Sequence, residues 1–375
     1  SFTAPCGPVS IKIPIDIQKR LMDLPAELQP LPVARVQAEA AAVRALADRL
    51  LQARRPLLWL GGGARGAGEA VARFVKMGWG VVTSVQGRGI VPEDDPACLG
   101  SYNLQPPAEA LYQSCDAMLV VGSRLRSNET LSYKLKLPGK LYRIDANPLA
   151  HNRGYASDYF VHGDAAHTLD ALADLLEGRC AVDPALLGDV QRARAAAAGQ
   201  VDEGLGAYAV LKDALAAQVG KKLWWVRDIT LSNSMWGNRA PVLDHPRAGV
   251  HALGGGIGQG LAMAIGTAIA DTEHRLGRRT VALVGDGGFV LNVGELACAV
   301  QERADILILL MNDSRYGVIR NIQDDIYGSR HCYVDLHTPD FAAFCASLKA
   351  SHFLLDDPAR TREVLAQACE RRGPV

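Results

Sequence analysis

Short segments made almost entirely of apolar residues alternate with longer segments of helical periodicity along most of the chain. The apolar runs at residues 57–60, 117–121 and 306–311 lack the polar alternation of a strand that has one face in water. Such strands are buried on both faces, as in parallel sheets covered by helices on each side. The sequence therefore predicts an α/β chain with doubly wound, three-layer domains and mainly parallel sheets.

The alternation falls into two series, which suits a chain of 375 residues with more than one domain. The first series occupies residues 34–178 and the second occupies residues 207–375. Residues 179–206, rich in Ala, Arg and Gly, predict a connector with helical content. Strands of the first series are expected at residues 57–60, 80–84, 117–121, 140–144 and 159–162.

Charge and composition exclude several classes of partner. Forty basic residues balance forty acidic ones without a long run of like charge, so we expect no nucleic-acid partner and no anionic-membrane anchor. No apolar run approaches the ~20 residues that a bilayer span requires, and no secretory leader opens the chain, so we expect a cytoplasmic protein. The eight cysteines form no C-x-x-C pair, which argues against a zinc site or a disulfide framework.

One βαβ unit at residues 280–319 carries the strongest chemical signal. An apolar strand ends in Gly285 and Asp286, a helix follows, and a second apolar strand leads to Asp313. Parallel strands end at the same edge of a sheet, so the two carboxylates could face one another and bind Mg²⁺. Gly287 and Gly288 would let backbone N–H groups approach a phosphate. The alternative is an ordinary Asp-Gly turn or a helix cap.

The spacing of 27 positions from Asp286 to Asp313 resembles the signature of enzymes dependent on thiamine diphosphate (ThDP). Together with the rest of the chain, it is similar to the acetolactate synthase and 2-oxo acid decarboxylase family, which includes benzoylformate decarboxylase-like enzymes. The resemblance implies that Asp286, Asp313 and the main-chain carbonyl of Arg315 bind the metal. It extends the cofactor-binding set to Gly285, Gly287, Gly288, Tyr316, Gly317 and Val318.

Two upstream segments complete the expected cofactor site. The resemblance implies that Ile257, after a triple glycine, wedges between the two rings of ThDP, and that the carbonyl of Gly255 holds the aminopyrimidine group. Thr230, Ser232 and Asn233 follow a strand that ends at Asp228, and their side chains could hydrogen-bond a phosphate. The alternatives are close packing of a helix for the glycines and ordinary loop or N-cap roles for the polar residues.

The first series is similar to the central domain of the same family, which binds FAD in some members and ADP or nothing in others. Its glycine-rich segment at residues 61–68 follows a strand. Residues 99–107 lack the glycine pattern typical of flavin-containing acetolactate synthases, which argues against FAD. Ile322 stands where the biosynthetic acetolactate synthases carry a Trp, which argues against a role in branched-chain synthesis.

The resemblance implies a ThDP- and Mg²⁺-dependent lyase or transferase that makes or breaks a C–C bond next to a carbonyl of a small-molecule substrate. We expect decarboxylation of a 2-oxo acid, with aldehyde release or acyloin formation. The alternatives are cleavage like that of 2-hydroxyacyl-CoA lyase or oxalyl-CoA decarboxylase, and a noncatalytic scaffold that keeps the fold.

The family also has an N-terminal pyrimidine-binding domain, whose glutamate starts catalysis across a subunit interface. Alternating Val9, Ile11, Ile13 and Ile15 predict a strand over residues 7–16, and Pro-rich residues 24–35 predict a linker. We interpret residues 1–33 as the tail of that domain with its linker, and the final RRGPV as the approach to one more strand. We therefore expect a homodimer or homotetramer, and expect residues 1–375 alone to be inactive; a split enzyme is the alternative.

Overall fold

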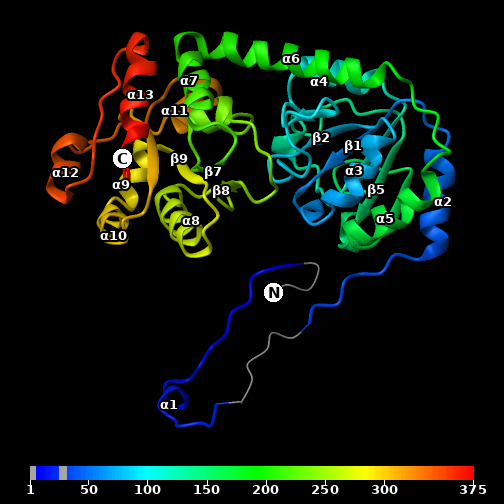
Figure 1. Ribbon diagram of the computed structural model, residues 1–375, viewed down its shortest axis with the longest axis horizontal. Coiled ribbons are helices and arrows are strands. Elements are labelled where there is room, and N and C mark those ends of the chain that lie inside the picture. The colour runs from blue at the N-terminus through cyan, green and yellow to red at the C-terminus, as the bar shows by residue number, and fades with distance from the viewer. Residues whose placement is uncertain (1–5, 25–31) are drawn as a thin grey trace.

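The computed structural model describes residues 6–24 and 32–375, and the second of these ranges contains two α/β bodies with one parallel sheet each (Figure 1). The first sheet has the order β3-β2-β1-β4-β5-β6 and the second has the order β10-β9-β7-β8. Every strand pair in both sheets is parallel within the described residues. This confirms the predicted fold class.

Helices cover both faces of the first sheet. Alternate residues of β1 point to opposite sides, so Leu58 and Leu60 pack in the core under α2, α3 and α5, whereas Leu57 and Trp59 pack under α4 and α6. The strands are β1 Pro56–Leu60, β2 Gly80–Thr83, β3 Cys98–Gly100, β4 Ala117–Val121, β5 Leu141–Asp145 and β6 Tyr159–His162. The helices are α2 Ala40–Leu50, α3 Gly68–Lys76, α4 Pro106–Gln113 and α5 Ala165–Leu176, with the short turns η1 Gly62–Ala64, η2 Ser127–Glu129 and η3 Pro148–Ala150. Each strand predicted for residues 34–178 is present within a residue of its expected bounds, and in this sheet only the three-residue β3 was not predicted.

The second sheet is covered in the same way. Val281 and Leu283 of β9 face α7 and α13, whereas Ala282 and Val284 face α8 and α10. The strands are β7 Leu223–Arg227, β8 Gly249–His251, β9 Arg279–Gly285 and β10 Ile306–Met311. The helices are α7 Ala209–Val219, α8 Gly260–His274, α9 Asp286–Leu291, α10 Glu295–Gln301, α11 Gly317–Tyr327, α12 Phe341–Leu348 and α13 Thr361–Glu370, with η4 Gly206–Tyr208, η5 Asn233–Gly237 and η6 Pro358–Arg360. The last residues pair with the edge of the sheet, since Pro374 lies opposite Ile306 in a parallel bridge.

A long helix, α6 Leu186–Leu205, lies within the expected connector and joins the two bodies (Figure 1). Its residues Leu186, Val190 and Ala193 pack on the first sheet. Its last residue, Leu205, packs in the core of the second body. The connector is therefore a structural element that contacts both cores.

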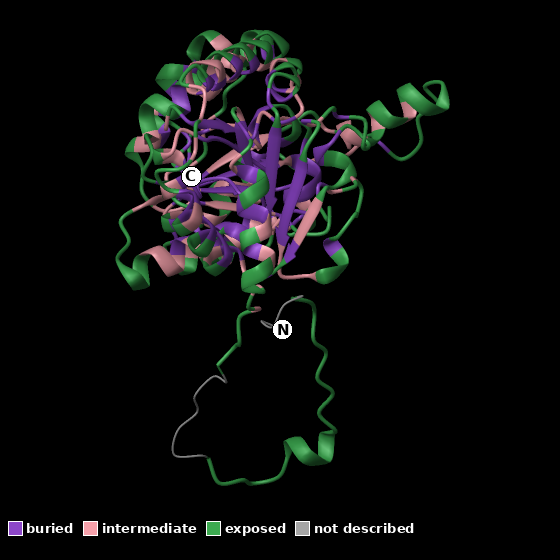
Figure 2. Ribbon diagram, turned by 90° about the vertical axis from the view of Figure 1, so that its right-hand side faces the viewer, coloured by how far each residue is buried: buried purple, intermediate pink, exposed green. Residues whose placement is uncertain are grey.

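The strand predicted over residues 7–16 is wrong. Residues 7–14 belong to no strand, and a single helical turn, α1 Ile15–Gln18, follows them. Ile11 and Ile15 are 79% and 71% exposed, and the segment extends away from both sheets (Figure 2). A strand needs a neighbour for its N–H and C=O groups, and the described residues offer this segment none. Most of the predicted linker, residues 25–31, lies outside the described residues.

Among the described residues, no helix combines the length and the apolar character needed to cross a bilayer.

Candidate functional site

The ends of β9 and β10 bring the two predicted metal ligands to one edge of the second sheet. Gly285 pairs with Met311, so the strands end level. Asp286 follows Gly285 directly, and Asp313 lies two residues beyond Met311. Both aspartates line a cavity of about 1320 Å³.

Asp286 has the environment of a cation ligand. The residue is 2% exposed, and Oδ1 accepts a hydrogen bond of 2.8 Å from the N–H of Gly287. Oδ2 is buried without a hydrogen-bond partner among the described residues. Burial raises the pKa of Asp286, and repulsion from Asp313 adds to this, while backbone N–H groups act in the opposite direction. A buried, partnerless carboxylate oxygen is an orphan that a hard cation would satisfy.

The loop after β10 directs the main chain of Arg315 toward Asp286. Arg315 forms an isolated antiparallel bridge with Asp335, flanked by hydrogen bonds of 2.8 Å from Tyr316 N–H to Val334 and from Leu336 N–H to Ser314. In such a bridge the N–H and C=O of the central residue point away from the partner segment. The backbone N–H of Arg315 accordingly lies near enough to the Asp286 carboxyl to act against the rise of its pKa. The carbonyl of Arg315 lies on the same side, which fits the expected main-chain ligand.

Asp313 completes this donor set from an exposed position. A Cβ on Gly317, the first residue of α11, would lie 3.2 Å from its Oδ2. Across residues 6–24 and 32–375, no group of three or more His, Cys, Asp or Glu side chains gathers to hold a metal. A cation between Asp286 and Asp313 would therefore need main-chain, water or phosphate oxygens as further ligands, as Mg²⁺ commonly has.

Gly287 and Gly288 allow close packing, which the sequence did not reveal. A Cβ on Gly287 would lie 2.6 Å from Cε1 of Tyr316, and a Cβ on Gly288 would lie 3.0 Å from Oδ2 of Asp228. The absence of both side chains lets α9 begin directly against the loop that carries Tyr316 and against the end of β7.

Asp228 is a positioning residue that the sequence analysis passed over. It is 1% exposed, and its carboxylate accepts three backbone N–H groups: Ile229 at 2.7 Å, Gly258 at 2.9 Å and Gly260 at 3.0 Å. These bonds fasten the segment of residues 254–258 before α8, the glycine loop, to the end of β7. An acidic residue at a strand end was the only available signal, and it is equally typical of an ordinary turn.

The glycine loop presents Gly255 and Ile257 to the cavity. Gly254 and Gly255 have φ values of +69° and +76°, a backbone conformation that side-chain-bearing residues rarely adopt. No atom lies within 4 Å of a Cβ placed on either glycine, so the peptide faces open space. Ile257 is 37% exposed at the rim.

Three residues of the turn after β7 were predicted to contact phosphate, and only two of them line the cavity. Thr230 and Ser232 line the cavity, as do Gly285, Gly287, Gly288, Tyr316, Gly317 and Val318. Asn233 does not line it: the residue is 2% exposed, and its Nδ2 donates to Nε2 of His251 at 3.2 Å. Burial and the nearby Arg227 lower the pKa of His251 to about 4, so this imidazole is neutral near pH 7. The structure thus places Asn233 in a neutral hydrogen-bonded pair behind the cavity wall.

Apolar side chains surround the mouth of the cavity. Leu231 and Met235 are each 39% exposed and Ile319 is 48% exposed, and all three line the cavity. Further along α11, Ile322 and Ile326 continue an exposed apolar stripe. Groups of exposed apolar residues beside a cavity are typical of surfaces that another domain or subunit covers.

In the first body, the predicted glycine-rich segment packs against neighbouring loops. A Cβ on Gly61 would lie 2.2 Å from the carbonyl oxygen of Gly122, and a Cβ on Gly87 would lie 2.1 Å from that of Leu60. These glycines let three strand-to-loop connections meet at the carboxyl edge of the sheet. Close packing of the loops therefore explains why these positions require Gly, and a bound nucleotide is not needed for that explanation.

The fold and the site define a class. Residues 43–172 match the family described as "Thiamine pyrophosphate enzyme, central domain", and residues 232–375 match "Thiamine pyrophosphate enzyme, C-terminal TPP binding domain". The chain therefore belongs to the thiamine pyrophosphate (ThDP) enzymes, and it contains their central and C-terminal domains.

Curated relatives align with most of this chain. The chain is 32% identical over 326 residues to the "Probable 2-ketoarginine decarboxylase AruI" of Pseudomonas aeruginosa, covering 86% of this chain and 57% of the relative. It is 26% identical over 394 residues to a "Probable acetolactate synthase large subunit" of Methanocaldococcus jannaschii, covering 98% and 65%. It is 27% identical over 330 residues to the "Acetolactate synthase isozyme 1 large subunit" of Escherichia coli, covering 86% and 57%. The chain thus spans less than two thirds of the length of these relatives.

Proposed function

We propose that this protein, as a whole, is a ThDP- and Mg²⁺-dependent enzyme that decarboxylates a 2-oxo acid. The observation that carries the proposal is the buried, partnerless Oδ2 of Asp286 in a cavity that Asp313 also lines. Membership of the ThDP enzymes indicates ThDP as the cofactor, and Asp286 and Asp313 offer the oxygen ligands that Mg²⁺ would need beside it.

Seven of the residues that line the cavity have specific roles in this proposal. Asp286, Asp313 and the carbonyl of Arg315 hold Mg²⁺, and Thr230 and Ser232 offer hydroxyl groups to the diphosphate. The carbonyl of Gly255 would orient the aminopyrimidine ring, and Ile257 would pack against the cofactor. ThDP supplies, when bound, a carbanion for attack on the substrate carbonyl and an electron sink for the bond that breaks.

Two observations support this substrate class, namely the name of one relative and the residue at position 322. The Pseudomonas relative is named as a decarboxylase of a 2-oxo acid. Ile322 of α11 is 41% exposed where the biosynthetic acetolactate synthases carry a Trp, which favours decarboxylation over the joining of two oxo acids. Acyloin formation of the acetolactate type is the second candidate, because several relatives are named as acetolactate synthases.

The exposed apolar residues at the mouth of the cavity favour the presence of a partner domain. In this proposal a pyrimidine-binding domain covers Leu231, Met235 and Ile319, within a homodimer or homotetramer. We also propose a cytoplasmic location, because the spacing of the eight cysteines does not indicate a secreted disulfide framework.

A decarboxylation assay tests the function. The complete gene product, stripped with EDTA, is supplied with ThDP, Mg²⁺ or both, and CO₂ release is followed for a panel of 2-oxo acids that includes 2-ketoarginine. We expect turnover only with both additions and none in Asp286→Ala. Turnover without added ThDP in stripped protein, or unaltered turnover in Asp286→Ala, contradicts the proposal.

A second assay tests the requirement for the partner domain. We propose that residues 1–375 alone bind ThDP weakly and do not turn over. Measurable turnover by this span under the same conditions would show that its own residues complete the site.

A further inference from the structure

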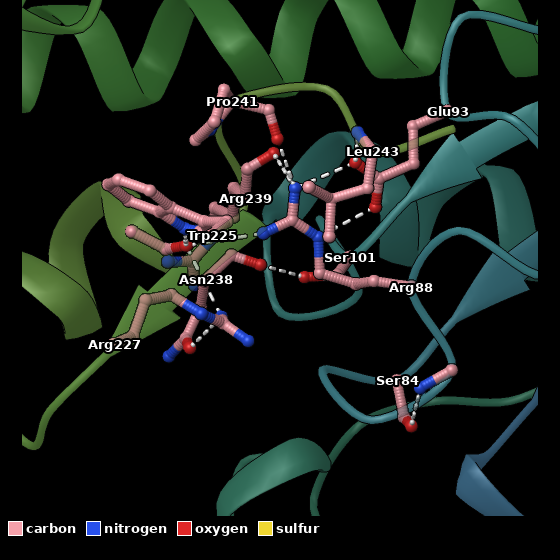
Figure 3. Close-up of polar contacts among 12 residues, drawn as sticks. Ser84, Arg88, Glu93, Ser101, Trp225, Arg227, Asn238, Arg239, Pro241 and Leu243 are labelled. Carbon is pink, nitrogen blue, oxygen red and sulfur yellow. Dashed lines mark hydrogen bonds and ion pairs between the residues drawn. The ribbon is translucent and has the colours of Figure 1, made fainter. Parts of the chain in front are cut away.

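A buried ion pair of the central domain forms hydrogen bonds with the main chain of the ThDP-binding domain (Figure 3). The side chains of Arg88 and Glu93, in the loop after β2, are 1% and 4% exposed. Nε and Nη2 of Arg88 each donate a hydrogen bond of 2.7 Å to Glu93, which fixes the plane of the guanidinium group. Arg194 of α6 donates to the carbonyls of Glu93, Asp95 and Cys98, so the connector helix also holds this loop.

From this position Arg88 reaches into the second body. Its guanidinium donates to the carbonyls of Gly237, Arg239 and Pro241. Ser101 donates to the carbonyl of Asn238, and Glu93 exchanges two hydrogen bonds with the main chain of Leu243. Six hydrogen bonds therefore hold the main chain of residues 237–243 from the central domain.

The held segment continues directly from the rim of the cavity. The N–H of Asn238 donates to Asn233 at 2.9 Å, and the N–H of Ser234 donates to Thr230 at 3.2 Å. The carbonyl of Gly237 also accepts from Trp225 at 2.8 Å. A shift of Gly237 would therefore be transmitted through η5 to Thr230, which lines the cavity.

We infer that Arg88 is a positioning residue for the cofactor site: through residues 237–241 it holds the turn of residues 230–236 in the conformation that binds ThDP. The inference rests on the proposed function, because its effect is exerted on the proposed ThDP site. It assigns to the central domain control over cofactor affinity without any contact with the cofactor. Lysine cannot replace Arg88 fully, since its three donors start from one atom and cannot meet both Glu93 and three carbonyls.

The test uses the complete gene product with Arg88→Met, Arg88→Lys and the control Arg73→Met. Arg73 forms ion pairs with Asp174 and Glu177 within the central domain alone. ThDP affinity is measured by calorimetry at saturating Mg²⁺, and amide hydrogen exchange is compared between residues 229–243 and β9. We expect Arg88→Met to weaken ThDP binding about ten-fold, which corresponds to about a tenth of the molecules having the turn in its binding-competent conformation. Amide exchange should become faster in residues 229–243 and stay unchanged in β9. Arg88→Lys should lie between, and Arg73→Met should match the wild type.

The opposite results would overturn the inference. The inference is refuted if folded Arg88→Met has wild-type ThDP affinity and wild-type amide exchange in residues 229–243. It is also refuted if Arg73→Met loses as much ThDP affinity as Arg88→Met. If Arg88→Met fails to fold, Ser101→Ala, which removes only the bond to Asn238, decides: a smaller change in the same direction supports the inference, and no change refutes it. A wild type that binds no ThDP refutes the proposed function, while the exchange comparison still decides whether Arg88 holds the turn.

Discussion

Replacing Asp228 with Asn should loosen the glycine loop of the site at a measurable cost in stability. The buried carboxylate accepts the N–H groups of Ile229, Gly258 and Gly260. In Asp228→Asn the amide NH₂ faces at least one of these donors, so one buried N–H loses its acceptor at a cost of about 1–3 kcal/mol. The other bonds lose their charge assistance, and easier burial of a neutral amide offsets part of that loss.

The net expectation is a free energy of unfolding lower by about 2–4 kcal/mol, measured by urea unfolding at pH 7. Amide exchange at Gly258 and Gly260 should become faster. Asp340→Asn is the matched control, because Asp340 is an exposed N-cap of α12 and Asn caps a helix equally well. A loss below about 1 kcal/mol in Asp228→Asn, or unchanged exchange at both glycines, would refute the role given to this carboxylate.

Two further perturbations follow from the same geometry. His251 has its pKa lowered to about 4 from an ordinary value of 6.5, chiefly by burial, so the unfolded chain takes up its proton first as pH falls. The contribution of His251 to the free energy of unfolding should be fully present above pH 6.5 and should decrease by about 1–3 kcal/mol toward pH 4. Acid unfolding curves of His251→Gln should lack this decrease. Gly287→Ala should force the Tyr316 ring aside, because the new Cβ would lie 2.6 Å from Cε1, and lower the thermal midpoint at a cost of about 1–3 kcal/mol. The control Gly294→Ala, with no atom within 4 Å, should leave the midpoint and ThDP binding unchanged; equal effects at both glycines would count against the packing argument.

The buried framework was readable from the sequence because its signal is local. Apolar runs such as those of β4 and β10 occur where both faces of a strand are covered, and their order along the chain implies parallel pairing. Asp286 and Asp313 could be placed together for the same reason, since the ends of adjacent parallel strands meet at one edge.

What the sequence could not reveal depends on partners distant along the chain. Ile11 and Ile13 alternate with polar residues as in a strand, but alternation does not say whether a neighbouring strand is present. Arg88 and Glu93 stand in a Gly- and Pro-containing segment that resembles an exposed loop, and only the fold shows that residues 237–243 bury them. The direction of the Asn233 side chain likewise depends on His251, which belongs to β8 and is distant from η5 in the sequence.

Calorimetric titration of ThDP into the complete gene product, with and without Mg²⁺, tests the proposed site most directly. The wild type should bind ThDP only when Mg²⁺ is present, and Asp286→Ala and Asp313→Ala should each abolish that binding while amide exchange in β9 and β10 stays as in the wild type. A wild type that binds no ThDP, or variants that bind as tightly as the wild type, would contradict the assignment of Asp286 and Asp313 as the metal ligands of a ThDP site.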